Sequence, residues 1–334
     1  MTTGMDTGPA IEADDLVKHF GDTDAVDGVS FTVPRGSVLG LLGPNGAGKT
    51  TTVRMMTTLT KPTSGTARVN GHDVLREPDA VRRSMGLTGQ AATVDELLTG
   101  RENIRLIGAL YGLNPSYVRK AADELLERFS LTDAGGRPAK TYSGGMRRRL
   151  DLAAALVASP PVLFLDEPTT GLDPRSRIDL WEAIEELVGD GTTVLLTTQY
   201  LEEADRLADR IAVVDHGHVI AEGTADDLKT RVGGLRVEVT LTHEAAAFAA
   251  MSALECMSDE PVHADGELVV VQVAERSGAI MEAARRLSQA GVGAEDIAVR
   301  RPTLDDVFLS LTGHAAEEAE RESDDARELV EVVA

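Results

Sequence analysis

The sequence predicts an α/β fold over its first two thirds, followed by a small α+β domain. Up to about residue 230, short apolar runs typical of strands alternate with segments whose apolar residues recur every three or four positions, as in amphipathic helices. This alternation is the signature of a layered α/β domain. The segment around 230–235 interrupts the pattern, and a different order of elements follows it. Two folded domains are therefore expected in this chain of 334 residues.

Each element of the first domain follows from its local pattern. The apolar runs 38–42 and 162–165 are expected strands, as are 85–87 and 193–196. A hairpin is expected where two apolar runs flank Gly217, at 211–215 and 219–222. Helices are expected at 49–59, 101–111, 116–129, 147–158 and 181–188.

The second domain, 235–312, has the order βαββαβ. Strands are expected at 235–241, 267–274 and 297–299, with a weaker one near 257–262, and helices at 244–254, 278–290 and 304–311. This order predicts a small ferredoxin-like α+β domain. The last segment, 314–334, carries eight acidic residues against two arginines and is expected to be a solvated tail.

Charge and composition exclude several classes of protein. Acidic residues outnumber basic ones by 55 to 33, giving a net charge of −22 that repels phosphate backbones, so no nucleic-acid partner is expected. The densest basic run is 147–149, which we interpret as a helix face near an interface. The single cysteine excludes an internal disulfide. The N-terminal segment is unlike a signal peptide and the longest apolar stretch, 152–165, is too short to span a bilayer, so we expect a cytoplasmic protein.

A phosphate-binding loop is predicted between the first apolar strand and the helix that follows it. Residues 43–50 match G-x-x-x-x-G-K-[ST] in this strand–loop–helix context. Glycines let backbone N–H groups surround phosphate oxygens at a helix N-terminus, the lysine neutralises them, and the threonine hydroxyl can bind Mg²⁺. The residues expected to bind nucleotide here are Gly43, Pro44, Asn45, Gly46, Ala47, Gly48, Lys49, Thr50 and Thr51.

Two acidic residues follow the apolar strand 162–165. Asp166 lies at its C-terminal end, where ligands bind in open α/β sheets, and is expected to hold Mg²⁺ together with Thr50. Glu167 is expected to polarise a water for in-line attack on a phosphate. Alone, an Asp-Glu pair after a strand usually belongs to a helix start or a loop, but a phosphate loop earlier in the chain favours the catalytic interpretation.

A third motif, Ser143-Gly144-Gly145, precedes an expected helix. Free N–H groups and a hydroxyl at a helix start form an anion-binding shape, although for this motif in isolation a simple capping loop is the better explanation.

Together and in this order, the three motifs resemble those of the ATP-binding cassette (ABC) ATPases, over about residues 10–230. The resemblance implies ATP and Mg²⁺ as ligands, and it implies that Phe20 stacks on adenine and Gln90 bridges Mg²⁺ to the transport machinery. It also implies that Ser143, Gly144 and Gly145 complete the nucleotide site of a second copy of the chain, and that Asp173 lies in the loop crossing that dimer interface. Residues 101–129 would form a helical subdomain that docks on membrane-spanning permease subunits.

The similarity is closer to the daunorubicin/doxorubicin-resistance-type exporter ATPases. Their third motif often has tyrosine before and methionine after it, as at Tyr142 and Met146 here. Residues 301–309 resemble the C-terminal motif of that subgroup, and 235–312 resemble its extra domain. The implied location is the cytoplasmic face of the cell membrane.

One position departs from the family pattern. Many cassette ATPases have a histidine that contacts the γ-phosphate after the strand 193–196, and this chain has Gln199. Glutamine can donate and accept hydrogen bonds but does not titrate near neutral pH. We therefore expect Gln199 to act beside Glu167 in catalysis.

The leading hypothesis is an ATPase subunit that drives efflux of a drug-like substrate through separate membrane chains. A soluble cassette protein that remodels ribosomes or DNA is an alternative, but such proteins carry two cassettes or a long coiled coil, and the stretch between Thr50 and Ser143 leaves no room for either. A regulatory ATP sensor that does not hydrolyse is a third possibility, which Glu167 opposes and Gln199 slightly favours.

Overall fold

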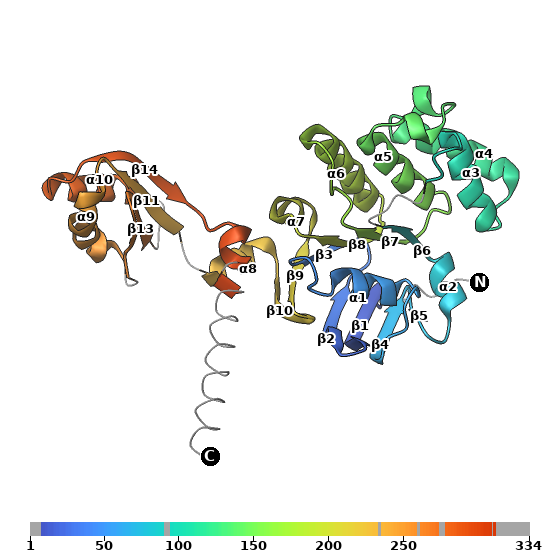
Figure 1. The fold of residues 1–334 in the computed structure, drawn as a ribbon, viewed down its shortest axis with the longest axis horizontal. Coiled ribbons are helices and arrows are strands. Elements are labelled where there is room, and N and C mark those ends of the chain that lie inside the picture. The colour runs from blue at the N-terminus through green and yellow to red at the C-terminus, as the bar shows by residue number, and fades with distance from the viewer. Residues whose placement is uncertain are drawn as a thin grey trace, which may run out of the picture. The chain divides into compact units, whose positions relative to one another are not determined.

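A computed structural model describes residues 8–89, 94–232, 235–258, 261–273, 278–308 and 310–311 of the chain. The chain divides into two compact units, Met1–Ala225 and Asp226–Ala334 (Figure 1). Across the described residues, every helix is too short or too polar to span a lipid bilayer. The predicted tail at 314–334 lies outside the described residues.

A six-stranded, mainly parallel sheet forms the centre of the first unit. Its strand order is β10-β9-β3-β8-β7-β6, and β10 is antiparallel to β9 while the other neighbours are parallel. The strands are β3 (Val38–Leu42), β6 (Met85–Thr88), β7 (Val162–Asp166), β8 (Thr193–Thr198), β9 (Arg210–Asp215) and β10 (His218–Gly223). Because β3, β7 and β8 run in parallel, the loops that follow them meet at one edge of the sheet.

The apolar run of β7 is explained by burial on both faces of the sheet. Leu163 and Leu165 belong to one apolar cluster and Val162 and Phe164 to the other, so successive side chains leave opposite faces and all are buried. Each fully buried side chain of this size contributes about 1.5–3 kcal/mol relative to exposure. This strand is therefore held rigidly where it delivers Asp166 to the sheet edge.

A second, antiparallel sheet lies on one side of the central sheet, and α1 (Lys49–Met56) packs with both sheets in one apolar cluster (Figure 1). Its order is β2-β1-β4-β5. The strands are β1 (Ile11–Phe20), β2 (Thr23–Val33), β4 (Ser64–Val69) and β5 (His72–Asp73), and α2 (Pro78–Arg83) follows them. The sequence patterns do not predict this sheet, because β1 carries charged residues and pairs with β2 through three register shifts that interrupt its alternation.

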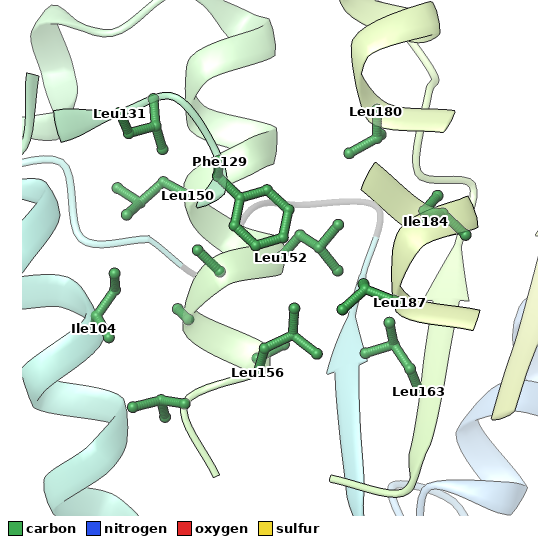
Figure 2. Packing of buried hydrophobic residues seen from close by; sticks show 14 of the residues in the cluster. Ile104, Phe129, Leu131, Leu150, Leu152, Leu156, Leu163, Leu180, Ile184 and Leu187 are labelled. Carbon is green, nitrogen blue, oxygen red and sulfur yellow. The ribbon is translucent and has the colours of Figure 1, made fainter. Parts of the chain in front are cut away.

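Helices cover the opposite face of the central sheet. They are α3 (Gly100–Leu110), α4 (Pro115–Arg128), α5 (Gly144–Ala155), α6 (Pro174–Gly189) and α7 (Leu201–Leu207), with short turns η1 (Thr132–Ala134) and η2 (Ala139–Thr141). Figure 2 shows their apolar cluster, with Phe129 beside Leu150 and Leu152 of α5, and with Leu187 of α6 toward Leu163 of β7. The cluster joins the α3–α4 layer to the sheet, so the predicted helical subdomain packs on the same core.

Capping side chains shift several helix boundaries from the predicted ones. The helix expected at 147–158 begins earlier because the Ser143 hydroxyl accepts a hydrogen bond from the Met146 N–H, and the helix expected at 181–188 begins at Pro174 because Asp173 caps it. The first helix ends at Met56 rather than at residue 59, since Thr58 has a φ of 65°.

The second unit contains an antiparallel sheet of order β12-β13-β11-β14. Its elements are α8 (Ala225–Val232), β11 (Leu235–Leu241), η3 (Glu244–Ala246), α9 (Ala247–Leu254), η4 (Glu255–Met257), β12 (His263–Asp265), β13 (Leu268–Val273), α10 (Ala279–Gln289) and β14 (Ala294–Arg300). Alternate valines of β11 and β13 pack with α9 and α10 in one core. The weak strand expected near 257–262 is misplaced, because 255–257 forms a helical turn and the strand begins at His263.

The motif 301–309 contributes a helical segment, 304–308, to this unit. The Asp306 carboxylate accepts hydrogen bonds from the N–H and hydroxyl of Thr303, which caps the segment. The same carboxylate pairs with the Arg236 guanidinium on β11. Leu304 and Val307 are buried.

Gly108 in α3 tests how tightly α3 and α4 pack. A Cβ at this position would lie 2.6 and 2.7 Å from the two methyl carbons of Val118 in α4. We expect Gly108→Ala to lower the free energy of unfolding by about 1–3 kcal/mol, because the overpacking outweighs the helix preference of alanine. The measurement is urea unfolding followed by circular dichroism.

The matched control is Gly189→Ala at the end of α6, where an added Cβ has open space around it. Its expected effect is a gain of about 0.5–1 kcal/mol. Equal effects of the two substitutions would contradict the packing argument.

Candidate active site

The loop between β3 and α1 has a shape that requires glycine at two positions. Gly48, which precedes α1, has a φ of 101°, and a Cβ there would lie 2.4 Å from the Ala25 carbonyl oxygen. A Cβ on Gly43 would lie 2.1 Å from the Val214 carbonyl oxygen. The loop therefore holds its backbone close to neighbouring strands, with the α1 N-terminus at its end.

Lys49 turns back onto this loop. Its Nζ donates hydrogen bonds to the carbonyls of Gly43 at 2.8 Å and Pro44 at 2.9 Å, and it lies 3.6 Å from Oε1 of Glu167. Burial lowers the pKa of the Lys49 ammonium, while the carboxylates of Glu167 and Asp166 oppose this effect. The ammonium is thus held between the loop carbonyls and the Glu167 carboxylate.

Thr50 and Asp166 come together across the edge of the sheet. The Thr50 hydroxyl donates to Oδ1 of Asp166 at 3.0 Å, and the Thr197 hydroxyl of β8 donates to the same oxygen at 2.6 Å. A hydroxyl and a carboxylate are hard oxygen donors of the kind that Mg²⁺ prefers, so these residues fit that ion. The predicted third contact, Gln90, lies outside the described residues.

Glu167 has a strained backbone and is fixed at its N–H. Its φ of 50° lies in the left-handed region, which non-glycine residues occupy rarely and at a cost. Its N–H donates to both the carbonyl and the hydroxyl oxygen of Thr197, each at 3.1 Å. The Thr170 hydroxyl donates to its carboxylate at 3.4 Å. Strain maintained in this way orients the carboxylate toward Lys49.

Lys49, Thr50 and Glu167 line one cavity of about 400 Å³. Its lining includes Asn45, Gly48, Lys49, Thr50, Thr51, Glu167 and Gln199. Gln199 reaches it from the segment between β8 and α7, as expected if the loops after three parallel strands share one edge. The Lys49 ammonium and the Gln199 amide can bind phosphate oxygens, and the oxygens of Thr50 and Glu167 can face a cation. This lining therefore suits a polyphosphate bound together with a cation.

Phe20 and the Ser143 motif lie apart from this cavity lining. Phe20 ends β1 with 53% of its surface exposed, and the Lys18 ammonium lies 4.9 Å from its ring centre. Ser143, Gly144 and Gly145 begin α5, and neither they nor Phe20 are among the described residues that line the cavity. An exposed aromatic ring is nonetheless suited to stacking on a planar base.

The Ser143 motif is packed against the start of α6. A Cβ on Gly145 would lie 2.4 Å from the Ser176 hydroxyl, and that hydroxyl donates to the Asp173 carboxylate at 2.7 Å. Hydrogen bonds from the hydroxyl and the N–H of Ser176 lower the pKa of the Asp173 carboxyl group. Two segments for which the family resemblance implies an interface role, Asp173 and the Ser143 motif, are therefore neighbours in one chain.

Two residues beside the site, Thr197 and Arg148, were not predicted from the sequence. Thr197 is a buried polar residue in β8, where its hydroxyl donates to the Asp166 carboxylate and accepts from the Glu167 N–H. Arg148 is 7% exposed and donates to backbone carbonyls of the loop after β7. The interpretation of 147–149 as one interface-facing helix side is wrong for Arg148. Its signal was its spacing, three residues after Gly145 and four before Leu152, on the buried side of α5.

Comparisons with known proteins agree with this geometry. The family model described as "ABC transporter" matches residues 26–170. The daunorubicin resistance ATP-binding protein DrrA3 of Streptomyces coeruleorubidus is 56% identical over 91% of this chain and 96% of its own length. The daunorubicin/doxorubicin resistance ATP-binding protein DrrA of Streptomyces peucetius is 50% identical over 95% and 97%.

Solved structures show the same fold in the first unit. The structure of an ATP-binding subunit of an ABC transporter matches with a TM-score of 0.61 at 31% identity, covering 66% of this chain and 92% of that one. A dimeric ATP-binding cassette in a post-hydrolysis state, bound to ADP and phosphate, matches with a TM-score of 0.59 at 26% identity, covering 64% and 98%.

Thr197→Val tests whether one hydroxyl organises the site. Valine has nearly the same shape but cannot donate to Asp166 or accept from the Glu167 N–H. We expect the free energy of unfolding to fall by about 1–3 kcal/mol, the cost of leaving buried polar groups with fewer partners. Thr197→Ser keeps the hydroxyl but lacks the methyl group that valine retains, so it measures the contribution of the methyl group separately. Unchanged stability in Thr197→Val would contradict the role of the hydroxyl.

Proposed function

The chain belongs to the ABC transporter family as an ATP-binding, ATP-hydrolysing subunit, and we propose that it drives efflux of daunorubicin-like drugs through separate membrane-spanning permease subunits. The observation that carries this proposal is the convergence of Lys49, Thr50 and Glu167 on one cavity, with Asp166 hydrogen-bonded to Thr50 behind its lining. The names of the DrrA relatives supply the drug class. The proposed location is the cytoplasmic face of the cell membrane.

We propose that the loop 43–50 and the α1 N-terminus bind the β- and γ-phosphates of ATP. Backbone N–H groups and the helix dipole favour negative charge there. Thr50 and Asp166, with Gln90, would hold Mg²⁺, which when bound neutralises charge that develops on the phosphate oxygens. Phe20 would stack on the adenine.

The contact between Lys49 and Glu167 suggests how binding prepares hydrolysis. In the structure described here, Nζ lies 3.6 Å from Oε1 of Glu167. A γ-phosphate entering the cavity would compete for the ammonium, because a phosphate carries more charge than a carboxylate. Glu167 would then be available to accept a hydrogen bond from the attacking water and orient it in line with the phosphate. Gln199 would donate a hydrogen bond to the γ-phosphate.

We propose that two copies of the chain enclose two ATP molecules. The Ser143 motif presents a helix N-terminus outside the lining of its own chain's cavity, which suits a contact with the nucleotide of a second copy. The dimeric state of a structurally similar cassette supports this arrangement. Binding would close the pair and hydrolysis would open it, moving permease subunits docked on 101–129.

The second unit fits a ferredoxin-like domain, which we propose for 235–312. The spatial strand order β12-β13-β11-β14 supports this assignment, and so do the helices α9 and α10, which follow β11 and β13 along the chain. The ATPase core is assigned to 10–230 and the acidic tail to 314–334. We propose that the C-terminal domain stabilises assembly with the membrane partner.

Substitutions of Lys49 and Glu167 are expected to block different steps, ATP binding and ATP hydrolysis respectively. Lys49→Ala should abolish ATP binding, because it removes the charge that meets the ground-state phosphates, whereas Glu167→Gln should bind ATP and stall hydrolysis. A fluorescent ATP analogue measures binding, phosphate release measures hydrolysis, and size-exclusion chromatography with ATP should show a Glu167→Gln dimer.

Wild-type hydrolysis by Glu167→Gln would disprove the catalytic assignment. The exporter assignment is tested separately, in cells that produce the chain with its permease. Wild-type cells should expel daunorubicin and Glu167→Gln cells should retain it. Retention by both, with intact ATPase activity, would mean that the transported substrate is a different one.

Gln199 is expected to contribute a hydrogen bond without a titration. Gln199→Ala should lower turnover about 10- to 1,000-fold with little change in ATP affinity, since the lost contact forms mainly in the transition state. Wild-type turnover should show no titration assignable to this position between about pH 5.5 and 7.5, while Gln199→His could introduce one, because a histidine gains a proton as the pH falls through its pKa. Steady-state ATPase assays decide this, and unchanged turnover in Gln199→Ala would make Gln199 a bystander.

A further inference from the structure

Arg148 connects α5 to two segments of the active site through backbone carbonyls. Its Nε donates to the carbonyl of Pro168 at 2.6 Å, and its Nη2 donates to the carbonyls of Asp166 and Glu167 at 3.2 and 3.1 Å. Its Nη1 donates to the carbonyl of Gly89 at 2.5 Å. One guanidinium thus bridges the loop after β7 and the end of the β6 segment, immediately before Gln90.

The charge of Arg148 is supported although the side chain is buried. Burial lowers its pKa, and the carboxylates of Asp151, Asp166 and Glu203 oppose this effect. The nearest of these, on the same helix, is Asp151, whose Oδ2 lies 3.6 Å from Nη1. A charged guanidinium with several donors in a fixed fork is suited to holding carbonyls that face it from different segments.

The carbonyls of Asp166 and Glu167 belong to the peptide groups on either side of the Glu167 Cα atom, so their positions affect the placement of the Glu167 side chain. Glu167 has a left-handed φ of 50° and is held at its N–H by Thr197 of β8. Arg148 of α5 holds the carbonyl of the same residue. Its two peptide groups are therefore fixed by different elements, and this fixes the Cα–Cβ direction from which the carboxylate extends.

Arg148 also lies close to the Ser143 motif. Both belong to one helix, and five residues of α-helix span about 7.5 Å. Gly145 packs closely against Ser176, since a Cβ on Gly145 would lie 2.4 Å from the Ser176 hydroxyl oxygen. A displacement of the motif would therefore reach the carbonyls through a rigid helix rather than through a flexible loop.

We propose that Arg148 is a positioning residue for hydrolysis, which holds the Glu167 carboxylate in its productive orientation and links it to the Ser143 motif of the same chain. This inference rests on the proposed roles of Glu167 and Ser143. When the Ser143 motif contacts the nucleotide of a second copy, a shift of α5 changes the position of Arg148 and therefore of Glu167, which orients the attacking water in its own chain. The two nucleotide sites of a pair are coupled through this side chain.

The test compares Arg148→Met with Arg149→Met in the full-length chain. Arg149 is the matched control, because it lies next on the same helix and donates to the Phe129 carbonyl of the helical layer at 3.3 Å, away from the site. Arg148→Met should lower kcat about 10- to 100-fold and keep KM for ATP within about threefold, the pattern of a misplaced catalytic group. Arg149→Met should keep kcat within about twofold.

Two further variants separate positioning from stability. Arg148→Met/Asp151→Asn removes the buried charge pair together, so it should unfold at a higher denaturant concentration than Arg148→Met while turnover stays low. Arg148→Lys keeps the charge, but a single ammonium cannot reach carbonyls on both segments, so its turnover should also fall. If Arg148→Met does not fold, Arg148→Lys and the double variant carry the test.

Recovery of turnover together with stability in the double variant would overturn the proposal, and so would wild-type kcat in Arg148→Lys or an equal loss in Arg149→Met. Glu167→Gln is measured in parallel. If it hydrolyses ATP normally, the proposed function of Glu167 fails. If it stalls while Arg148→Met turns over normally, only the inference about Arg148 fails.

Discussion

Three charged side chains lie almost out of contact with water at one edge of the central sheet, and the structure around them depends on compensating their charge. Lys49, Asp166 and Glu167 are each at most 5% exposed. Burial of a charge without partners is strongly unfavourable, so each needs hydrogen bonds that hold it in place. Loop carbonyls serve Lys49, and the hydroxyls of Thr50 and Thr197 serve Asp166. The same contacts that compensate the charges also fix the geometry of the site.

Packing on both faces of the sheet gives this edge its rigidity. Val162 and Phe164 pack toward α1, and Leu163 and Leu165 pack toward the helical layer, so β7 cannot shift without opening two apolar clusters. Glu167, whose backbone is strained, is the residue immediately after the end of β7. A strained residue persists only when its surroundings outweigh its cost, and the two clusters provide that support.

Much of the fold was accessible from local pattern, and the exceptions have physical causes. The α/β alternation and the phosphate-loop context predict the P-loop fold of the first unit, and the structure confirms it. The sheet built on β1 was not predicted, because bulges and outward-facing charges hide its alternation. At the site, the predicted Lys49, Thr50, Glu167 and Gln199 line one cavity, whereas Phe20 and Ser143 stay outside its lining.

The sequence by itself determined which residues are candidates for the chemistry, because a phosphate loop and an acidic pair after an apolar strand are local patterns of a few consecutive positions. Only the tertiary structure decided which side chains hold that chemistry in place. Three adjacent arginines are alike in the sequence, yet Arg148 alone of the three donates to the carbonyls around Glu167, and Thr197 reaches the same residue from another strand. Such contacts join positions far apart in the chain, so they are decided by how the sheet and α5 pack and not by any local pattern.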